Sequence, residues 1–387
     1  MLKRPDEIQA LKTLLNRYPI VGLIGARQVG KTTLARMIGR DERQTSTHFD
    51  LENPEDQARL SDPMLGLRDL HGLIILDEVQ LKPEVFPVLR VLADRVRSSA
   101  KFLLLGSASP EMIQRSAESL AGRIAYHELS GFSIREVGVG NIEKLWLRGG
   151  FPPSYLAPTN AASLDWRSQF IRTFLERDLP QLGVFIRATT LRRFWSMLAH
   201  YHGQIWNSSE FARSFGVADT TIRNYLDVLS SALVVRQLLP WSENISKRQV
   251  KSPKVYITDS GLLHSLLNLQ SIRDLQGHPK LGASWEGFLI GQITRSLGAR
   301  PEECFFWATH SGAELDLLVV RGRKRIGFEI KRTTAPSLTR SMQVSLADLK
   351  LTRLFVIHAG KDLFPLAERV TALPAEKIHT ELSLRSL

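Results

Sequence analysis

Cysteine is almost absent from this 387-residue chain: Cys304 is the single one, so no disulfide can form within it. Such usage is typical of a reducing compartment and predicts a cytoplasmic protein. Long hydrophobic runs are missing too, since no stretch reaches the roughly 18 apolar residues of a membrane helix. The N-terminal segment lacks the apolar centre and cleavage site of a signal peptide. We therefore expect no membrane association.

Acidic residues are too few to balance the basic ones. The chain holds 51 Lys and Arg against 39 Asp and Glu, which gives a net charge of +12. A basic excess favours a polyanion such as nucleic acid as partner. A basic surface that binds no nucleic acid is the alternative, and charge alone does not separate the two.

The chain is too long for one ordinary domain, and we expect two or three. Residues 1–131 alternate short apolar runs with helical stretches, the pattern of an α/β domain with a parallel sheet and flanking helices. The apolar run LIIL before Asp77 is typical of a strand buried on both faces. The expected strands are Ile20–Gly25, Thr47–Asp50, Leu73–Asp77, Lys101–Gly106 and Ile124–Leu129.

Two further regions are predicted beyond this domain. Residues 132–277 show mainly helical periodicity, as in the spacing of Trp166 and Phe170, and the breaker cluster Gly149–Pro153 is a candidate hinge. Residues 278–387 return to an α/β pattern. The elements expected there are helix Ser284–Ser296, strands Cys304–Ala308, Glu314–Val320 and Arg325–Lys331, helix Leu338–Lys350 and strand Leu354–His358.

The segment GARQVGKT fits the P-loop pattern G-x-x-x-x-G-K-T between an expected strand and an expected helix, Thr33–Arg40. Its glycines let backbone N–H groups point at phosphate oxygens, and the helix N-terminus adds positive potential. Lys31 is expected to reach the β- and γ-phosphates of ATP, and Thr32 to hold Mg²⁺. The expected ATP-binding residues are Gly25, Ala26, Arg27, Gln28, Val29, Gly30, Lys31, Thr32 and Thr33.

Two carboxylates follow the apolar run LIIL. Asp77 is expected to support the Mg²⁺ ion, directly or through water, and Glu78 to orient and polarise the attacking water. A glycine loop alone can be a chance turn. The loop and the acidic strand together predict an ATPase that uses Lys31 and Glu78 in catalysis.

Two more residues are candidates for the same site. Ser107 ends the strand LLLGS and can sense the γ-phosphate, or it can be an ordinary turn serine. Arg123 precedes the fifth strand and can act as an arginine finger in a neighbouring subunit, or it can be a surface arginine. Arg115 is the reserve candidate for the finger.

The stretch from Asn207 to Leu238 has the rhythm of a helix-turn-helix followed by a wing strand. Ser208 or Ser209 can cap a short first helix, Gly216 supplies the turn, and Asp219 can cap the second helix. Polar residues near the start of that helix suit DNA bases and phosphates. They are Thr220, Thr221, Arg223 and Asn224. Packing or protein contact without DNA is the alternative.

A second group of acids lies near the C-terminus. Asp316, in GAELDLLVV, shares a strand face with Glu314, and Glu329 shares one with Lys331 in IGFEIK. Such a strand pair resembles the PD-(D/E)XK nuclease core, with Glu286 as the extra acid on the preceding helix. Carboxylates of this kind hold Mg²⁺ beside a phosphodiester. Cleavage and a merely binding or structural module both remain open. Gln343 lies on the following helix, where some members carry a polar helper.

In nearly its whole length the chain resembles the bacterial and archaeal AAA+ ATPases that carry a second C-terminal region of long-unknown function. That resemblance implies an AAA+ P-loop core, a helical and winged-helix-like middle, a nuclease-like end and a homo-oligomer such as a hexamer. The segments that carry it are GARQVGKTTL, LIILDEVQ, LLLGSAS, SLAGRI, FSIREVG, RGGFP, FLERDLP, KSPKVYITDSGLL and GAELDLLV with IGFEIK.

Three functions follow as hypotheses. The first is an ATP-driven motor that processes DNA, supported by the charge, the helix-turn-helix candidate and the acidic cluster. The second is an ATP-gated, Mg²⁺-dependent nuclease. The third is a nucleotide-controlled switch that binds proteins and does not act on DNA.

Overall fold

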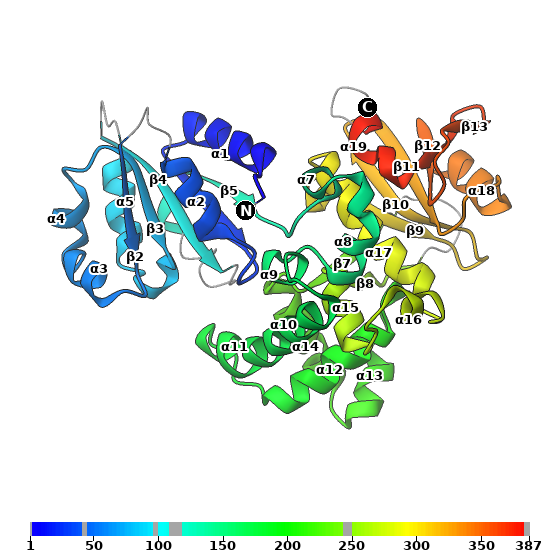
Figure 1. The fold of residues 1–387 in the computed structure, drawn as a ribbon, viewed down its shortest axis with the longest axis horizontal. Coiled ribbons are helices and arrows are strands. Elements are labelled where there is room, and N and C mark those ends of the chain that lie inside the picture. Colours follow the sequence, from blue (N-terminus) through cyan, green and yellow to red (C-terminus); the bar gives the residue numbers. More distant parts are fainter. Residues whose placement is uncertain (1, 41–44, 96–99, 108–117, 243–249, 383–387) are drawn as a thin grey trace. The chain divides into compact units, whose positions relative to one another are not determined.

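The computed structural model describes residues 2–40, 45–95, 100–107, 118–242 and 250–382. The chain divides into two compact units. Unit 1 comprises residues 1–131 with 231–233, and unit 2 comprises residues 132–230 with 234–387. Figure 1 labels the elements of both. Among the described residues no helix is long and apolar enough to cross a membrane.

Unit 1 is built on a five-stranded parallel sheet with the order β2-β3-β4-β1-β5. One strand, β4, therefore separates the strand before the glycine loop from the strand that ends at Asp77. The strands are β1 Ile20–Gly25, β2 Ser46–Asp50, β3 Gly72–Asp77, β4 Ala100–Ser107 and β5 Ile124–Glu128. Each expected strand is present within two residues of its expected limits.

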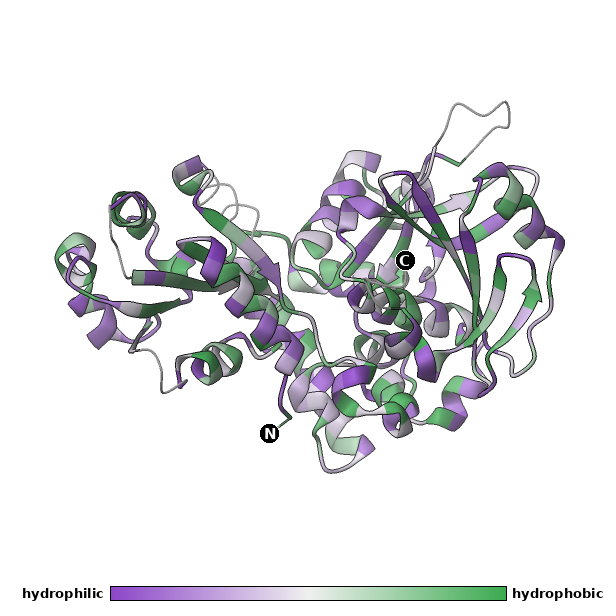
Figure 2. Cartoon of the chain, turned by 90° about the horizontal axis from the view of Figure 1, so that it is seen from above, coloured by the Kyte–Doolittle hydropathy of each residue, from purple (hydrophilic) through white to green (hydrophobic). Residues whose placement is uncertain are grey.

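Helices cover both faces of this sheet. The helices are α1 Pro5–Arg17, α2 Lys31–Gly39, α3 Pro54–Arg59, α4 Pro63–Leu67 and α5 Val85–Ala93, with a 3₁₀ turn η1 Val79–Leu81. Contacts place α1 and α2 against β1 and β4 on one face. Leu60, which follows α3, Leu67 of α4 and Leu89 of α5 join the apolar cluster on the opposite face. Figure 2 shows the central strands as largely hydrophobic between two-toned helices. Burial on both faces explains why LIIL is apolar throughout.

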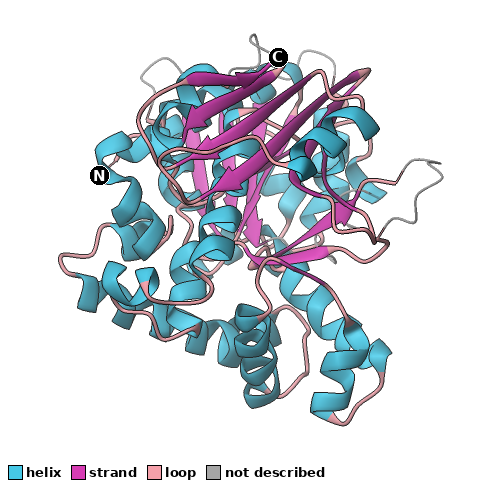
Figure 3. Ribbon diagram, turned by 90° about the vertical axis from the view of Figure 1, so that its right-hand side faces the viewer, coloured by secondary structure: helices cyan, strands magenta, loops and turns pink. Residues whose placement is uncertain are grey.

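Unit 2 is built on a nine-stranded mixed sheet with the order β13-β14-β12-β11-β10-β9-β7-β8-β6 (Figure 3). The strands are β6 Gln204–Ile205, β7 Val235–Pro240, β8 Lys254–Ile257, β9 Cys304–Ala308, β10 Glu314–Arg321, β11 Lys324–Lys331, β12 Arg353–His358, β13 Phe364–Ala367 and β14 Val370–Pro374. Strands from both sides of residue 277 share this sheet, because β7 pairs with β9. The expected division at residues 277 and 278 stays a prediction.

The helices of unit 2 lie mostly before β9. They are α7 Ile134–Val137, α8 Ile142–Arg148, α9 Pro152–Tyr155, α10 Asn160–Thr173, α11 Leu179–Gln181, α12 Ala188–His200, α13 Ser208–Phe215, α14 Asp219–Ser231, α15 Ser260–Leu266, α16 Ile272–Gln276, α17 Leu281–Ser296, α18 Arg340–Asp348 and α19 Ile378–Glu381. Short turns are η2 Val139–Asn141, η4 Pro301–Glu303 and η5 Ala375–Lys377, and η3 Phe174–Asp178 is a π-helical turn.

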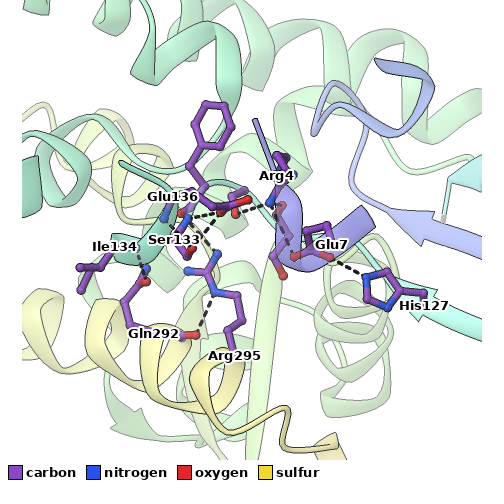
Figure 4. A network of polar contacts seen from close by, with 12 residues as sticks. Arg4, Glu7, His127, Ser133, Ile134, Glu136, Gln292 and Arg295 are labelled. Carbon is purple, nitrogen blue, oxygen red and sulfur yellow. Dashed lines mark hydrogen bonds and ion pairs between the residues drawn. The ribbon is translucent and has the colours of Figure 1, made fainter. Parts of the chain in front are cut away.

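Figure 4 shows hydrogen bonds and ion pairs of residues on each side of the unit boundary. In unit 1, Arg4 donates to the carbonyls of residues 130 and 131, and Glu7 pairs with His127 at 2.6 Å. In unit 2, the backbone N–H of Ile134 donates to Gln292 on α17. The candidate hinge Gly149–Pro153 lies inside unit 2 instead, where its Gly150 N–H donates to the half-buried Asp259.

Candidate nucleotide site

The glycine loop joins β1 to α2, as the P-loop pattern requires. Gln28 and Gly30 have φ angles of +61° and +102°, so the loop curls through the left-handed region just before the helix begins at Lys31. A side chain at position 25 would put its Cβ 2.6 Å from the carbonyl oxygen of Leu129 on the neighbouring chain segment. The sequence therefore needs glycine at both ends of the loop.

Lys31 is buried and folds back over this loop. Its Nζ donates to the carbonyl oxygens of Gly25 at 2.9 Å and Ala26 at 3.1 Å. Burial lowers the pKa of Lys31, although the nearby Glu78 and Asp77 carboxylates act in the opposite direction. The ammonium therefore sits at the mouth of the loop between backbone carbonyls and two acids.

Asp77 ends β3 and is almost fully buried. Burial raises its pKa, but the neighbouring His48 and Thr32 side chains and the Glu78 N–H outweigh this effect and lower the pKa below its usual value. His48 comes from β2, and its Nε2 lies 3.8 Å from Asp77 Oδ2. Asp77 is therefore held ionised next to the Thr32 hydroxyl.

Glu78 follows directly and has a strained backbone, with φ at +53°. Its carboxylate accepts a hydrogen bond from the side-chain amide of Gln80. Burial raises the pKa of Glu78, and the Gln80 bond and the Lys31 charge offset this only in part. The left-handed turn directs the chain away after β3 and keeps Glu78 beside Asp77 and Lys31.

This arrangement fits a magnesium nucleotide. Magnesium is usually held by one or two carboxylates with water and substrate phosphates, so the oxygens of Thr32 and Asp77 are a sufficient protein contribution. The remaining loop residues lie around it, with Val29 buried, Arg27 paired with Glu52 at 3.0 Å and Thr33 exposed on α2. These residues stay predicted ligands.

Arg123 and Ser107 are the two further candidates for this site, and the structure describes the side chain of Arg123 alone. Arg123 makes a two-pronged ion pair with Asp94, at 2.6 and 2.7 Å, and lies before β5, at the sheet edge opposite the glycine loop. Its role as a finger stays a prediction. The backbone of Ser107 ends β4, but its side chain lies outside the described residues, as does all of Arg115.

The helix-turn-helix candidate has the expected elements. Helix α13 ends at Gly216, which has the left-handed φ of +65°, and α14 begins at Asp219. Neither predicted serine caps the first helix. Its N-cap position is Asn207, which makes no side-chain capping hydrogen bond, and Ser208 and Ser209 donate to the carboxylate of Asp219. The tentative DNA residues Thr220, Arg223 and Asn224 are exposed, and Thr221 is half-buried.

The C-terminal acids come together in unit 2. We define the carboxylate cluster as Glu286 of α17, Glu314 and Asp316 of β10, and Glu329 of β11. Burial and the charge of Asp316 raise the pKa of both Glu286 and Glu329. Lys331 pairs with Glu329 at 2.7 Å. Sequence spacing therefore identified residues that are neighbours in space, except Gln343, which is exposed on α18.

A lysine that sequence reasoning missed lies within this cluster. Lys254 of β8 is 3.2 Å from Glu286 and also pairs with Glu314. Tyr256, two residues on, donates to the same Glu286 oxygen at 2.5 Å. Among the described residues, no group of three or more His, Cys, Asp or Glu side chains has an arrangement able to hold a metal ion. The predicted nuclease metal site of Glu286, Asp316 and Glu329 stays a prediction.

Comparison with known proteins gives three family matches. Residues 17–138 match an AAA domain, residues 139–273 match a domain of unknown function (DUF8612), and residues 281–378 match another (DUF4143). The uncharacterized proteins Rv2008c of Mycobacterium tuberculosis and Mb2031c of Mycobacterium bovis are each 52% identical to this chain. Each alignment covers 100% of this chain and 87% of the relative. The chain belongs to the same family as these two proteins.

Two solved structures show a distant likeness to this chain. The Walker-type ATPase PABY2304 of Pyrococcus abyssi is 16% identical, with 69% of this chain and 96% of that chain covered and a TM-score of 0.47. The RuvB Holliday junction branch migration motor of Thermotoga maritima is 18% identical, with 61% and 90% covered and a TM-score of 0.30. The AAA match and the parallel sheet together identify a P-loop NTPase fold in unit 1.

The sequence did not predict four residues that lie at the two sites. His48 and Gln80 touch the acidic pair of the nucleotide site, and Lys254 and Tyr256 touch the carboxylate cluster. The last two alternate in KVYI, which is a usable signal for a strand with one polar face. His48 is close to Asp77 only because β2 and β3 are neighbours, with Asp50 opposite Asp77 in the register.

Proposed function

We propose that this protein binds ATP with Mg²⁺ and hydrolyses it at the site of Lys31, Asp77 and Glu78. The observation that carries the proposal is the meeting of a buried lysine, an ionised aspartate and a glutamate at the glycine loop, where a helix begins. Bound Mg²⁺ would neutralise phosphate charge and polarise the reacting phosphate.

The chain's own residues have separate tasks in this proposal. The loop N–H groups and the start of α2 bind the phosphates. Lys31 exchanges the carbonyls of Gly25 and Ala26 for phosphate oxygens, which adds a positive charge where negative charge accumulates. Glu78, released from Gln80, orients a water molecule and accepts its proton.

The direct test is phosphate release from ATP by the purified chain and its variants. Lys31→Ala is expected to reduce turnover at least about 100-fold and to weaken nucleotide binding. Arg36→Ala is the matched control, because Arg36 is an exposed cation on the same helix. ATP uptake and turnover by Lys31→Ala equal to those of Arg36→Ala would refute the proposal.

We further propose that subunits assemble and that Arg123 completes a neighbour's site. The proposal is supported by its position before β5 and its exposed pairing with Asp94, which a neighbour's phosphates can replace. Turnover per subunit should then rise with protein concentration, and Arg123→Ala should lower turnover while leaving nucleotide binding intact. Turnover independent of concentration and of Arg123 would argue for a monomeric enzyme.

DNA is the partner we propose, on the basis of the net charge of +12 and the exposed start of α14. Duplex, branched and single-stranded DNA should stimulate ATP hydrolysis, and affinity should fall with salt. The double variant Arg223→Ala and Asn224→Ala should reduce both affinity and its salt dependence. Arg273→Ala, an exposed arginine on α16, is the control. No stimulation by any DNA would favour the protein-contacting switch.

A further inference from the structure

Lys254 is a buried cation that neither the nucleotide site nor the DNA proposal uses. Its side chain is only 4% exposed, yet it faces three carboxylates from two elements of unit 2. Its Nζ lies 3.2 Å from Glu286 Oε1 and 4.0 Å from Asp316 Oδ1, and it pairs closely with Glu314 Oε1. One ammonium therefore bridges α17 and β10.

The other contacts of the carboxylate cluster are also made by the chain itself. Asp316 Oδ2 accepts the backbone N–H of Ile330 at 2.7 Å, and Glu286 accepts the Tyr256 hydroxyl. Glu329 Oε1 pairs with Lys331. One carboxylate oxygen of the cluster, Glu329 Oε2, is buried without a hydrogen-bond partner. Donors of the chain itself thus already contact one oxygen of each of the four carboxylates.

A divalent metal does not fit this arrangement. Mg²⁺ requires about six oxygens at roughly 2.0–2.1 Å, and it would have to displace the ammonium from Glu286 and Asp316. A displaced Lys254 would then be a buried charge without its partners, which is costly. We propose that Lys254 is the resident cation of the carboxylate cluster and takes the place that a nuclease metal would need.

The motif KSPKVYITDSGLL thereby gains a function. Lys254 and Tyr256 occupy alternate positions of β8 and both reach Glu286. Asp259, further along the motif, caps α15 and accepts the N–H of Gly150. The strand supplies a fixed positive charge, so the cluster joins α17 to the sheet without a divalent ion.

Binding of Mn²⁺, followed by calorimetry and by electron paramagnetic resonance without nucleotide, tests this proposal. The full chain carries Asp77→Asn throughout, so that the nucleotide site lacks the carboxylate proposed to hold its metal ion. With Lys254 present we expect no saturable Mn²⁺ uptake. Lys254→Met should create a site for about one Mn²⁺ per chain, and adding Asp316→Asn should abolish that site. Lys254→Arg, which keeps the charge, is the control and should take up no Mn²⁺.

Two results would overturn the proposal. One is uptake of one Mn²⁺ by the chain with Lys254 that Asp316→Asn removes, and the other is a folded Lys254→Met variant that takes up none. If Lys254→Met is too unstable for a Mn²⁺ titration, the midpoint of its thermal unfolding tests the proposal instead. We expect a loss of about 10 °C from the unpaired acids, which Glu286→Gln with Glu314→Gln should restore. A loss that these neutral glutamines do not restore would equally contradict the proposal.

Discussion

At the scale of residues, Lys31 and Lys254 are both buried and illustrate two uses of one side chain. Lys31 donates to neutral carbonyls, and burial lowers its pKa. Burial also acts on Lys254, but the charges of Glu286, Asp316 and Glu314 outweigh it and raise the pKa. The ammonium of Lys31 can leave its carbonyl acceptors and bind an incoming anion. The ammonium of Lys254 stays in place because three carboxylates surround it.

Glu78 offers a test of the proposed division of labour at the nucleotide site. Glu78→Gln keeps the shape but removes the proton acceptor, so turnover should fall about 10²–10⁴-fold while ATP affinity changes only a few-fold. Steady-state phosphate release and equilibrium binding of a fluorescent ATP analogue measure the two quantities. A loss of affinity as large as the loss of turnover would mean that Glu78 mainly shapes the pocket.

Two buried histidines should make unit 2 sensitive to acid. Burial lowers the pKa of both His202 and His264 from 6.5 to about 3. Between pH 6.5 and about 3 the unfolded chain binds these protons and the folded chain does not, so stability decreases as pH falls through this window. Urea unfolding at several pH values measures the free energy of unfolding. This free energy should fall less steeply with decreasing pH for His264→Gln than for the wild type. His200→Gln, at an exposed position, should follow the wild-type curve; identical curves for both would contradict this.

At the scale of elements, helix α10 is joined to its neighbours through one buried side chain. Arg167 donates to the carbonyls of Leu147, which belongs to α8, and of Gly261, which belongs to α15. It also faces the charge of Asp259. A single guanidinium thus donates to backbone carbonyls of two neighbouring helices, and the Leu147 carbonyl also lies 3.0 Å from His264 Nδ1.

Arg167→Met should therefore destabilise unit 2 by about 2–4 kcal/mol, because it removes the donor to two buried carbonyls and the positive charge that faces Asp259. Thermal unfolding followed by circular dichroism measures the effect. Arg172→Met, on the exposed side of the same helix, is the matched control and should change the midpoint little. Equal midpoints for the two variants would show that α10 is held by apolar packing alone.

At the scale of the whole molecule, two units with separate sheets carry separate sites. Lys31, Asp77 and Glu78 of the nucleotide site belong to unit 1, and the carboxylate cluster belongs to unit 2. Nucleotide binding and the neutralisation of the cluster can be studied separately.

Binding of a slowly hydrolysed ATP analogue with Mg²⁺ should stabilise unit 1 by about 2.7 kcal/mol at a hundredfold excess over its Kd. Hydrogen exchange read by mass spectrometry should show slower exchange in β1, α2 and β3. Peptides of β10 and β11 should exchange as before. Lys31→Ala should remove the protection, and equal protection in both units would instead indicate a shared response.

The sequence by itself determined the nucleotide loop, the acidic pair, the five strands of unit 1 and the helix after the loop, since these depend on local backbone conformation and on apolar periodicity. It also identified the acids near the C-terminus, because alternate residues of a strand share a face. It could not reveal that β8 lies within reach of β10, with Lys254 against Glu286 and Glu314. Only the tertiary structure decided that, because the cost of burying a lysine depends on which charges surround it, and those charges come from strands and helices far apart in the chain.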